Sequence, residues 1–420
     1  MIEIRPGKID NATVSVPGSK SFSHRVLIAA ALSDGVCNIE NVLESEDTLL
    51  TMACLRQMGV AVDSTDNGCI IHGNDGMFQV VEDPIDLGNS GTSMRLLTAV
   101  AALGQGGYVL TGTPRMQQRP IQDLLDGLNQ LGVSAISTRG NGCPPVKVTG
   151  GMLAGGNVAL DCHTSSQFLS ALLLVAPLAA GPVEITVTRG PVSRPYIVLT
   201  VQVMEDFGIK LERDAYERFT VPGRQVYRAG THFVEPDSSQ AGYFWAAAAI
   251  GGASVKVKDT SRRSHQGDIR FTDILEKMGC EVRHEDDGIV VAGRPLTAVT
   301  VDMADMPDMV PTLAVVAAFA KGTTVIKNVA HLREKESDRL SAVATNLLKM
   351  GIEASCTTSG LIVEGGEPHD AEIETYNDHR IAMCFSVAGL VVPGIKIQNE
   401  TCVAKSFPNF WEVFQQLYNE

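Results

Sequence analysis

The sequence predicts an α/β protein of two domains, each with three βαβαββ repeats whose sheets surround buried helices, an inside-out α/β barrel. Three observations predict this fold. An apolar, alanine-rich helix followed by an amphipathic helix returns six times along the 420 residues. Glycines that end the amphipathic segments are about 70 residues apart, a period typical of repeat architectures. Short β-branched runs lie between the helices, and the length suits two domains better than one core.

The first helix of each repeat is expected to be buried on most sides, because it is apolar nearly all round. Each of these segments is rich in alanine, and most of them end at a glycine, which is a common helix terminator. The six segments span residues 24–35, 93–104, 166–181, 241–251, 309–322 and 379–389.

The second helix of each repeat has one apolar stripe and is expected to face solvent on the other side. Five of these helices end at Met58-Gly59, Leu131-Gly132, Phe207-Gly208, Met278-Gly279 and Met350-Gly351, and the sixth starts at Pro408. A hairpin follows, as in residues 280–284 and 288–292 around Asp-Asp-Gly.

Two crossings between the domains are expected, near residues 16–18 and 224–230. They give one domain of residues 18–228 and another of residues 1–17 plus 229–420. The first strand, residues 3–16, then belongs with the C-terminal half.

The composition argues against several classes of partner. A balance of 34 basic and 48 acidic residues, net −14, disfavours a surface for nucleic acid or anionic membranes. No apolar stretch reaches the length of a membrane span, and the first residues do not resemble a signal peptide. Nine scattered cysteines without metal-ligand spacing indicate reduced thiols, so we expect a cytoplasmic protein without a metal site.

The predicted helix starts carry small polar and basic residues, where free N–H groups and the helix dipole favour anions. Residues 17–25 read Pro-Gly-Ser-Lys-Ser-Phe-Ser-His-Arg, and residues 87–95 read Leu-Gly-Asn-Ser-Gly-Thr-Ser-Met-Arg. Each is either an anion site or an ordinary capped helix start. Residues 163–167 and 236–240 are near copies, of which one can bind a ligand while the other only caps.

The densest charged run, residues 332–340, allows two interpretations. A solvated helix start with i,i+4 pairs is one. A ligand site is the other, because a cation at a helix N-terminus opposes the dipole unless an anion lies there. Asp308 marks another helix start, and Arg380 and Lys405 are expected at the starts of the sixth repeat's two helices. Carboxylates beside such cations suit proton transfer.

Eight segments together resemble the 5-enolpyruvylshikimate-3-phosphate synthase family over nearly the whole chain. They are residues 17–25, 88–95, 119–121, 165–168, 307–308, 332–339, 378–380 and 405–408. The resemblance implies the two-domain repeat fold described above. It also implies transfer of the enolpyruvyl group of phosphoenolpyruvate to the 5-hydroxyl of shikimate 3-phosphate, with release of phosphate, in chorismate and aromatic amino-acid biosynthesis. No metal or organic cofactor is implied.

The resemblance also implies roles for individual residues. Shikimate 3-phosphate contacts, most of them in the 18–228 domain, would be Lys20, Ser21, Arg25, Ser165, Ser166, Gln167, Ser193, Tyr196, Asp308 and Lys335. Phosphoenolpyruvate contacts would be Lys20, Gly91, Arg119, Gln167, Arg339, Arg380 and Lys405. Asp308 would accept the hydroxyl proton, and Glu336 with Lys405 would manage the proton at the methylene carbon.

Two other functions stay open at this point. The sister enzyme that transfers enolpyruvyl to UDP-N-acetylglucosamine has Lys-Asn near its N-terminus and a cysteine in a mobile loop. Here Ser21 follows Lys20, and residues 112–118 contain no cysteine. A catalytically inert repeat scaffold would not need cations at so many helix starts. We expect a monomer whose partners are its two small-molecule substrates, on which its domains close.

Overall fold

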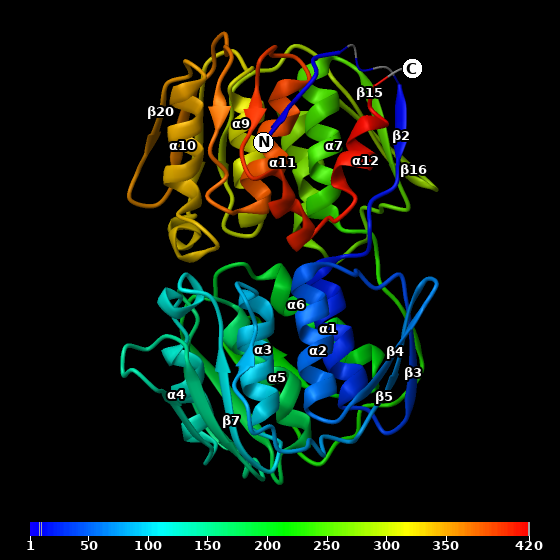
Figure 1. Cartoon of the computed structure of the whole chain (residues 1–420), viewed down its shortest axis with the longest axis vertical. Coiled ribbons are helices and arrows are strands. Elements are labelled where there is room, and N and C mark those ends of the chain that lie inside the picture. Colours follow the sequence, from blue (N-terminus) through cyan, green and yellow to red (C-terminus); the bar gives the residue numbers. More distant parts are fainter. Residues whose placement is uncertain (8, 10, 419–420) are drawn as a thin grey trace. The chain divides into compact units, whose positions relative to one another are not determined.

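The computed structural model describes residues 1–7, 9 and 11–418 of the chain (Figure 1). It divides into two compact units, unit 1 with Met1–Pro17 and Glu235–Glu420, and unit 2 with Gly18–Val234. The division after Val234 corrects the one expected after residue 228. Strand β14 (Thr231–Phe233) pairs in parallel with β3 (Val36–Glu40), and this pairing keeps the intervening segment in unit 2.

Unit 2 contains two kinds of helix, as the sequence predicts. Its α-helices are α1 (Lys20–Ala31), α2 (Glu46–Gln57), α3 (Gly91–Ala101), α4 (Gln122–Gln130), α5 (Gln167–Val175) and α6 (Pro195–Asp206), and its 3-10 helices are η1 (Met116–Gln118) and η2 (Ala176–Leu178). The glycines after α2, α4 and α6 adopt φ values of 91°, 85° and 81°, a left-handed conformation that favours glycine as a helix terminator.

The strands of unit 2 form three sheets with the same order of pairing. Besides β3 and β14 they are β4 (Ala61–Thr65), β5 (Gly68–His72), β6 (Ile85–Asp86), β7 (Gly106–Thr111), β8 (Ser134–Ser137), β9 (Val146–Gly150), β10 (Gly156–Asp161), β11 (Val183–Arg189), β12 (Glu212–Asp214) and β13 (Arg218–Val221). The orders are β14-β3-β5-β4, β6-β7-β9-β8 and β10-β11-β13-β12. In each sheet the first pair is parallel and the next two pairs are antiparallel.

Unit 1 also alternates apolar and amphipathic helices. Its α-helices are α7 (Ser238–Gly251), α8 (Phe271–Lys277), α9 (Val310–Ala317), α10 (Arg339–Lys349), α11 (His379–Gly389) and α12 (Phe410–Gln415). Its 3-10 helices are η3 (Gly267–Arg270), η4 (Pro307–Met309), η5 (Ala330–Glu334) and η6 (Glu400–Lys405). Helices α7, α9 and α11 pack against one another (Figure 1), and every residue of α9 and α11 is buried.

The strands of unit 1 form two four-stranded sheets and one of three strands. They are β1 (Ile2–Glu3), β2 (Ala12–Val14), β15 (Ser254–Lys258), β16 (Glu281–Glu285), β17 (Gly288–Ala292), β18 (Thr300–Asp302), β19 (Thr323–Lys327), β20 (Ala354–Cys356), β21 (Leu361–Glu364), β22 (Glu372–Ile373) and β23 (Lys396–Ile397). The orders are β16-β17-β15-β2, β18-β19-β21-β20 and β1-β23-β22.

The strands of unit 1 test two expectations from the sequence, the hairpin around Asp-Asp-Gly and the first strand. The hairpin of β16 and β17 is confirmed, with Glu285 opposite Gly288 across a two-residue turn. The single strand expected over residues 3–16 is wrong, because β1 pairs with β23 while β2 pairs with β15. Pro6 and Gly7 lie between the two strands, and proline has no N–H to continue a ladder. No helix among the described residues is long and apolar enough to cross a membrane.

Candidate active site

Arg25 connects three helices of unit 2 through hydrogen bonds. It lies on α1, and its Nε donates to Thr200 Oγ1 of α6 at 2.7 Å. Its Nη2 donates to Ser170 Oγ of α5 at 3.2 Å, and its Nη1 donates to the carbonyl of Ser21 at 2.7 Å. Burial lowers the pKa of this guanidinium to about 10, which still leaves it charged at neutral pH. A buried cation held by hydroxyl groups is suited to an anionic ligand.

The Tyr196 ring belongs to the same group of side chains. The Arg25 guanidinium carbon lies 6.0 Å from the ring centroid. Tyr196 is in the first turn of α6, and its backbone N–H donates to the carbonyl of Ser193 at 3.2 Å. Ser193 is buried and has a φ of 54°, an uncommon conformation for a residue other than glycine. The structure therefore places Arg25 near Ser193 and Tyr196, which lie far from it in the sequence.

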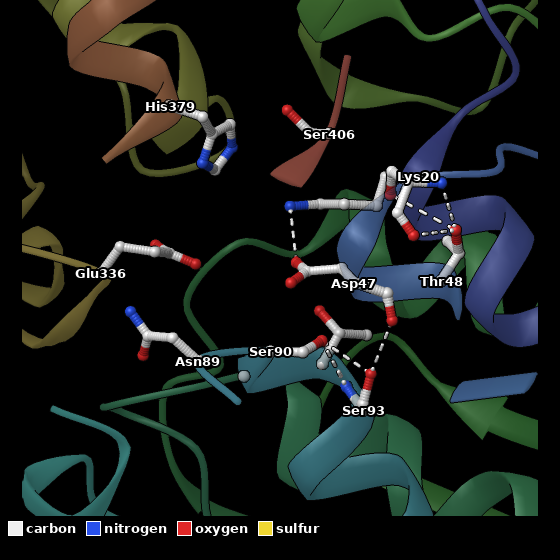
Figure 2. Close-up of polar contacts among 12 residues, drawn as sticks. Lys20, Asp47, Thr48, Asn89, Ser90, Ser93, Glu336, His379 and Ser406 are labelled. Atoms are coloured by element: carbon white, nitrogen blue, oxygen red, sulfur yellow. Dashed lines mark hydrogen bonds and ion pairs between the residues drawn. The ribbon is translucent and has the colours of Figure 1, made fainter. Parts of the chain in front are cut away.

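Lys20 is the first residue of α1, where a cation opposes the helix dipole. Its Nζ lies 3.2 Å from Oδ2 of Asp47, which is in the first turn of α2 (Figure 2). The Asp47 side chain is only 2% exposed, so this pair is largely shielded from water. A carboxylate therefore compensates the cation that the sequence places at this helix start.

A network of buried, hydrogen-bonded hydroxyl groups connects the starts of α1, α2 and α3. Ser93 Oγ lies 3.2 Å from the carbonyl of Asp47, to which it can donate. It also shares hydrogen bonds with the hydroxyls of Ser90 at 2.6 Å (Figure 2) and Thr51 at 2.8 Å. Nδ1 of His24 shares a hydrogen bond with Thr51 Oγ1 at 2.8 Å. These hydrogen bonds join the three helix starts.

Gly91 is the first residue of α3 and lies against two guanidinium groups. A Cβ at this position would collide with the guanidiniums of Arg119 and Arg95. Arg119 is buried and donates to the Asn89 carbonyl at 3.1 Å, and Arg95 donates to the Gly91 carbonyl at 3.1 Å. Only glycine leaves both arginines this close to the helix start.

The start of α5 supplies the remaining predicted residues of unit 2. Gln167 is its first residue, and its side-chain amide donates to Thr92 Oγ1 of α3 at 3.0 Å. Ser165 Oγ accepts a hydrogen bond from the Gln167 backbone N–H at 3.2 Å. Ser166 is the N-cap residue, but its side chain makes no capping hydrogen bond.

The near copy of this segment at α7 is used differently. There the Asp237 carboxylate caps the helix by accepting from the N–H groups of Ser239 and Gln240 at 2.9 and 3.0 Å. The two segments that the sequence could not distinguish thus differ in their capping.

Arg339 is the centre of a buried ionic cluster in unit 1. It is the first residue of α10, and its side chain is 2% exposed. Its nitrogens donate at 2.8 Å to each of three carboxylates, those of Asp308, Glu336 and Asp378. Burial opposes the charged form, but Asp378, Glu336 and Asp308 together raise the pKa of Arg339. Arg339 is therefore permanently charged, and its hydrogen bonds hold the three carboxylates in position.

Arg380 holds the other oxygen of Asp308. Its Nη2 donates to Asp308 Oδ2 at 2.7 Å, and its Nη1 donates to the Tyr243 hydroxyl at 3.4 Å. Asp378 caps α11 through the Arg380 backbone N–H at 3.0 Å. Both oxygens of Asp308, which belongs to η4, thus accept from guanidiniums, while its side chain stays 18% exposed and open to a ligand.

Lys335 and Lys405 complete the predicted residues of unit 1. Lys335 directly follows η5, and burial together with the nearby Lys335 charge lowers the pKa of His331 to about 3, so His331 is neutral. Lys405 is buried, but it ends η6 instead of starting a helix, which corrects the expectation. A cation at a C-terminal helix end is favourable, so the dipole argument does not apply to Lys405.

Each unit gathers charged groups suited to anionic ligands. Unit 2 offers cations and hydroxyls at helix starts, and unit 1 offers cations interleaved with carboxylates, which can take up or release protons. Among the described residues, no group of three or more His, Cys, Asp or Glu side chains is placed to hold a metal ion.

Several partners of the predicted residues were not found from the sequence. They are Asp47, Ser170 and Thr200. Each meets its partner through long-range packing, and only the position of Asp47 in a helix start gave a signal.

The chain was compared with known proteins. A model of the EPSP synthase (3-phosphoshikimate 1-carboxyvinyltransferase) family matches residues 4–414. The 3-phosphoshikimate 1-carboxyvinyltransferase of Syntrophobacter fumaroxidans is 46% identical over 97% of both chains, and that of Shewanella oneidensis is 44% identical over 96% of both. A solved EPSP synthase from Acinetobacter baumannii is similar with a TM-score of 0.83 and 31% identity, covering 99% of this chain and 97% of that one.

Proposed function

The chain belongs to the EPSP synthase family, and from this premise we propose that it transfers the enolpyruvyl group of phosphoenolpyruvate to the 5-hydroxyl of shikimate 3-phosphate and releases phosphate. It is a transferase of the shikimate pathway, which leads to chorismate and the aromatic amino acids. The observation that carries this assignment is the family match over residues 4–414 together with close relatives of the same name.

The finer fold proposed with this function is two domains of three βαβαββ repeats each, arranged as inside-out α/β barrels. The order of one parallel and two antiparallel pairs recurs in the four-stranded sheets and supports it, although the sheet β1-β23-β22 has only one pair of each kind among the described residues. We also propose a cytoplasmic monomer that needs no metal or organic cofactor.

Shikimate 3-phosphate is assigned mainly to unit 2. The proposed contacts there are Lys20, Ser21, Arg25, Ser165, Ser166, Gln167, Ser193 and Tyr196. Support comes from Arg25, a buried cation that joins α1, α5 and α6 and stands next to Tyr196. Asp308 and Lys335 of unit 1 are proposed to complete the set.

Phosphoenolpyruvate carries a phosphate and a carboxylate and is assigned to the cations of both units. The proposed contacts are Lys20, Gly91, Arg119, Gln167, Arg339, Arg380 and Lys405. The close approach of Arg119 to Gly91 supports an anion at the start of α3. In unit 1, the two guanidiniums on Asp308 can match a planar carboxylate.

Proton transfer is assigned to unit 1. Asp308 accepts the proton of the attacking 5-hydroxyl, and Glu336 with Lys405 manages the proton at the methylene carbon. The resulting tetrahedral adduct then loses phosphate. The bonds from Arg339 to Asp308 and Glu336 orient both carboxylates, and this is the structural support for the assignment.

Phosphate release from phosphoenolpyruvate, measured with and without shikimate 3-phosphate, tests the proposed function. We expect release only when both are present. UDP-N-acetylglucosamine is the control acceptor, and release that depends on it instead would replace the proposal with the sister activity. No release with either acceptor would contradict transferase activity altogether.

A further inference from the structure

Asp268 is a buried acid for which the proposed mechanism has no use. It lies in η3 and is 4% exposed. Within the described part of the chain, its carboxyl accepts a hydrogen bond from the Ser239 hydroxyl and none from a guanidinium or ammonium group. A buried carboxylate without a cation on it is costly. Asp268 therefore differs from the other acids of this region.

The polar face of α7 connects Asp268 with the ionic cluster. Ser239 and Tyr243 are four residues apart on this helix and so lie on one face. Ser239 bonds Asp268, and Tyr243 accepts from Arg380, which in turn bonds Asp308. Asp268 thus stands one helical turn from the cation that is assigned to phosphoenolpyruvate.

The bonding of the three acids around Arg339 indicates which acid of this region holds a proton. Asp308, Glu336 and Asp378 each accept directly from a guanidinium, so a cation compensates the charge of each carboxylate. Among the described residues, Asp268 has the Ser239 hydroxyl as its only hydrogen-bond donor, and the like charge of Asp308 acts on it. When acids crowd together, the proton stays on the one whose charge is least compensated.

We propose that Asp268 holds its proton in the free enzyme up to near-neutral pH and acts as a positioning residue. By staying uncharged it preserves the attraction of Arg380 for phosphoenolpyruvate. The inference rests on the proposed function for the identity of that ligand. When Asp268 ionises, its proton passes to solvent, and the new negative charge offsets part of the Arg380 charge.

The surrounding charges are consistent with this protonation. Burial, and then the charge of Asp308, raise the pKa of Asp268 to about 7, although Arg380 and the Ser239 hydrogen bond lower it. Asp237, the cap of α7, raises it as well. On the other packed elements, Asp273 of α8 pairs with Arg262 at 3.3 Å, and Arg270 of η3 itself reaches Asp305 at 3.8 Å.

Asp268→Asn tests the proposal, because asparagine has the shape of the neutral acid and can still accept from Ser239. The first measurement is the infrared carbonyl band of a protonated carboxyl group in the free protein between pH 6 and pH 8.5. We expect a band that disappears through about pH 7 in the wild type and is missing in Asp268→Asn. A wild type without the band at pH 6, or a band that survives in the variant, would overturn the proposal.

The second measurement is KM for phosphoenolpyruvate over the same pH range with saturating shikimate 3-phosphate. As the pH increases through 7, the KM of the wild type should increase, and this increase should be roughly three- to tenfold greater than in Asp268→Asn. The pH profile of kcat should be the same in both proteins. Identical KM profiles would overturn the positioning role. Asp273→Asn is the matched control on the neighbouring helix, and it should behave as the wild type in both measurements.

Ser239→Ala is the second variant, for use if Asp268→Asn does not fold. It removes the hydrogen bond that favours the charged carboxylate, so the infrared transition should move to higher pH. An unchanged transition would contradict the assignment of the band to Asp268. Absence of any turnover in the wild type would overturn the proposed function and the role at phosphoenolpyruvate, whereas the infrared band would still decide whether Asp268 holds a proton.

Discussion

The buried Asp268 carboxyl should make the stability of unit 1 depend on pH in an unusual direction. Most acids that gain a cationic partner on folding stabilise the protein as pH rises. The Asp268 pKa is instead raised on folding, from an ordinary 3.8 to about 7, chiefly by burial. Between these values the unfolded chain is ionised at this position while the folded chain still binds a proton. Stability therefore falls with rising pH across this window and levels off above it.

The size of the effect follows from the two values. Each pH unit between them costs 1.36 kcal/mol, so the loss over the whole window is about 4 kcal/mol. Asp268→Asn cannot ionise and escapes this loss. We expect the variant to exceed the wild type in free energy of unfolding by about 2 kcal/mol at pH 5 and about 4 kcal/mol at pH 8.

Urea unfolding, monitored by tryptophan fluorescence, measures this difference in free energy of unfolding in unit 1, which contains Asp268. The two tryptophans of the chain, Trp245 in α7 and Trp411 in α12, both belong to unit 1. Trp245 is fully buried and donates to the Ile289 carbonyl, so its emission should change on unfolding. A gap of equal size at pH 5 and pH 8, or a variant less stable at pH 8, would refute the reasoning. Asp273→Asn should show no pH-dependent gap.

Three further predictions concern the ionic cluster and Lys405. Asp308→Ala and Glu336→Ala should each lower turnover by about 10²-fold or more, and near-normal turnover in either variant would remove the substituted residue from the mechanism. Glu336→Ala should still bind shikimate 3-phosphate in calorimetry. Lys405→Met should abolish turnover while lowering Tm only slightly; a large drop in Tm with normal turnover in the cold would make Lys405 structural. Asp378→Asn should destabilise unit 1 by about 3 kcal/mol in the tryptophan assay, because Arg339 loses a buried charged partner, and an unchanged midpoint would contradict this.

The helices were predictable because their signals are local. Apolar periodicity located the two kinds of helix, and glycines marked the ends of the amphipathic ones. The apolar segments expected to end at Gly35, Gly181 and Gly322 are wrong at their ends, because α1, α5 and α9 stop several residues earlier. Asp-Asp-Gly located the β16–β17 hairpin. The boundary after Val234 was not predictable in the same way. Strand β14 has three residues, Thr231–Phe233, and long-range contacts assign it to unit 2, among them its pairing with β3 nearly two hundred residues earlier. Such pairing leaves no periodic signal in so short a segment.

The candidate site was predictable to the extent that it consists of helix starts. Lys20, Gly91, Gln167 and Arg339 all begin helices in the structure. Their roles toward the substrates stay predictions. The compensating partners were not predictable, because a lone acid such as Asp47 carries no sign in the sequence of which distant group it will meet.

Those partners change how the cations at the helix starts should be interpreted. A lysine or arginine there is costly alone, and in the sequence this cost indicates a missing anion. In the structure the anion is already present, since Asp47 compensates Lys20 and Asp308 compensates Arg380. Under the proposed function, phosphoenolpyruvate must then compete with these carboxylates for the same donors. Its two anionic groups can do so because they approach several cations at once, whereas a ligand with a single charge cannot offset the loss of each carboxylate partner.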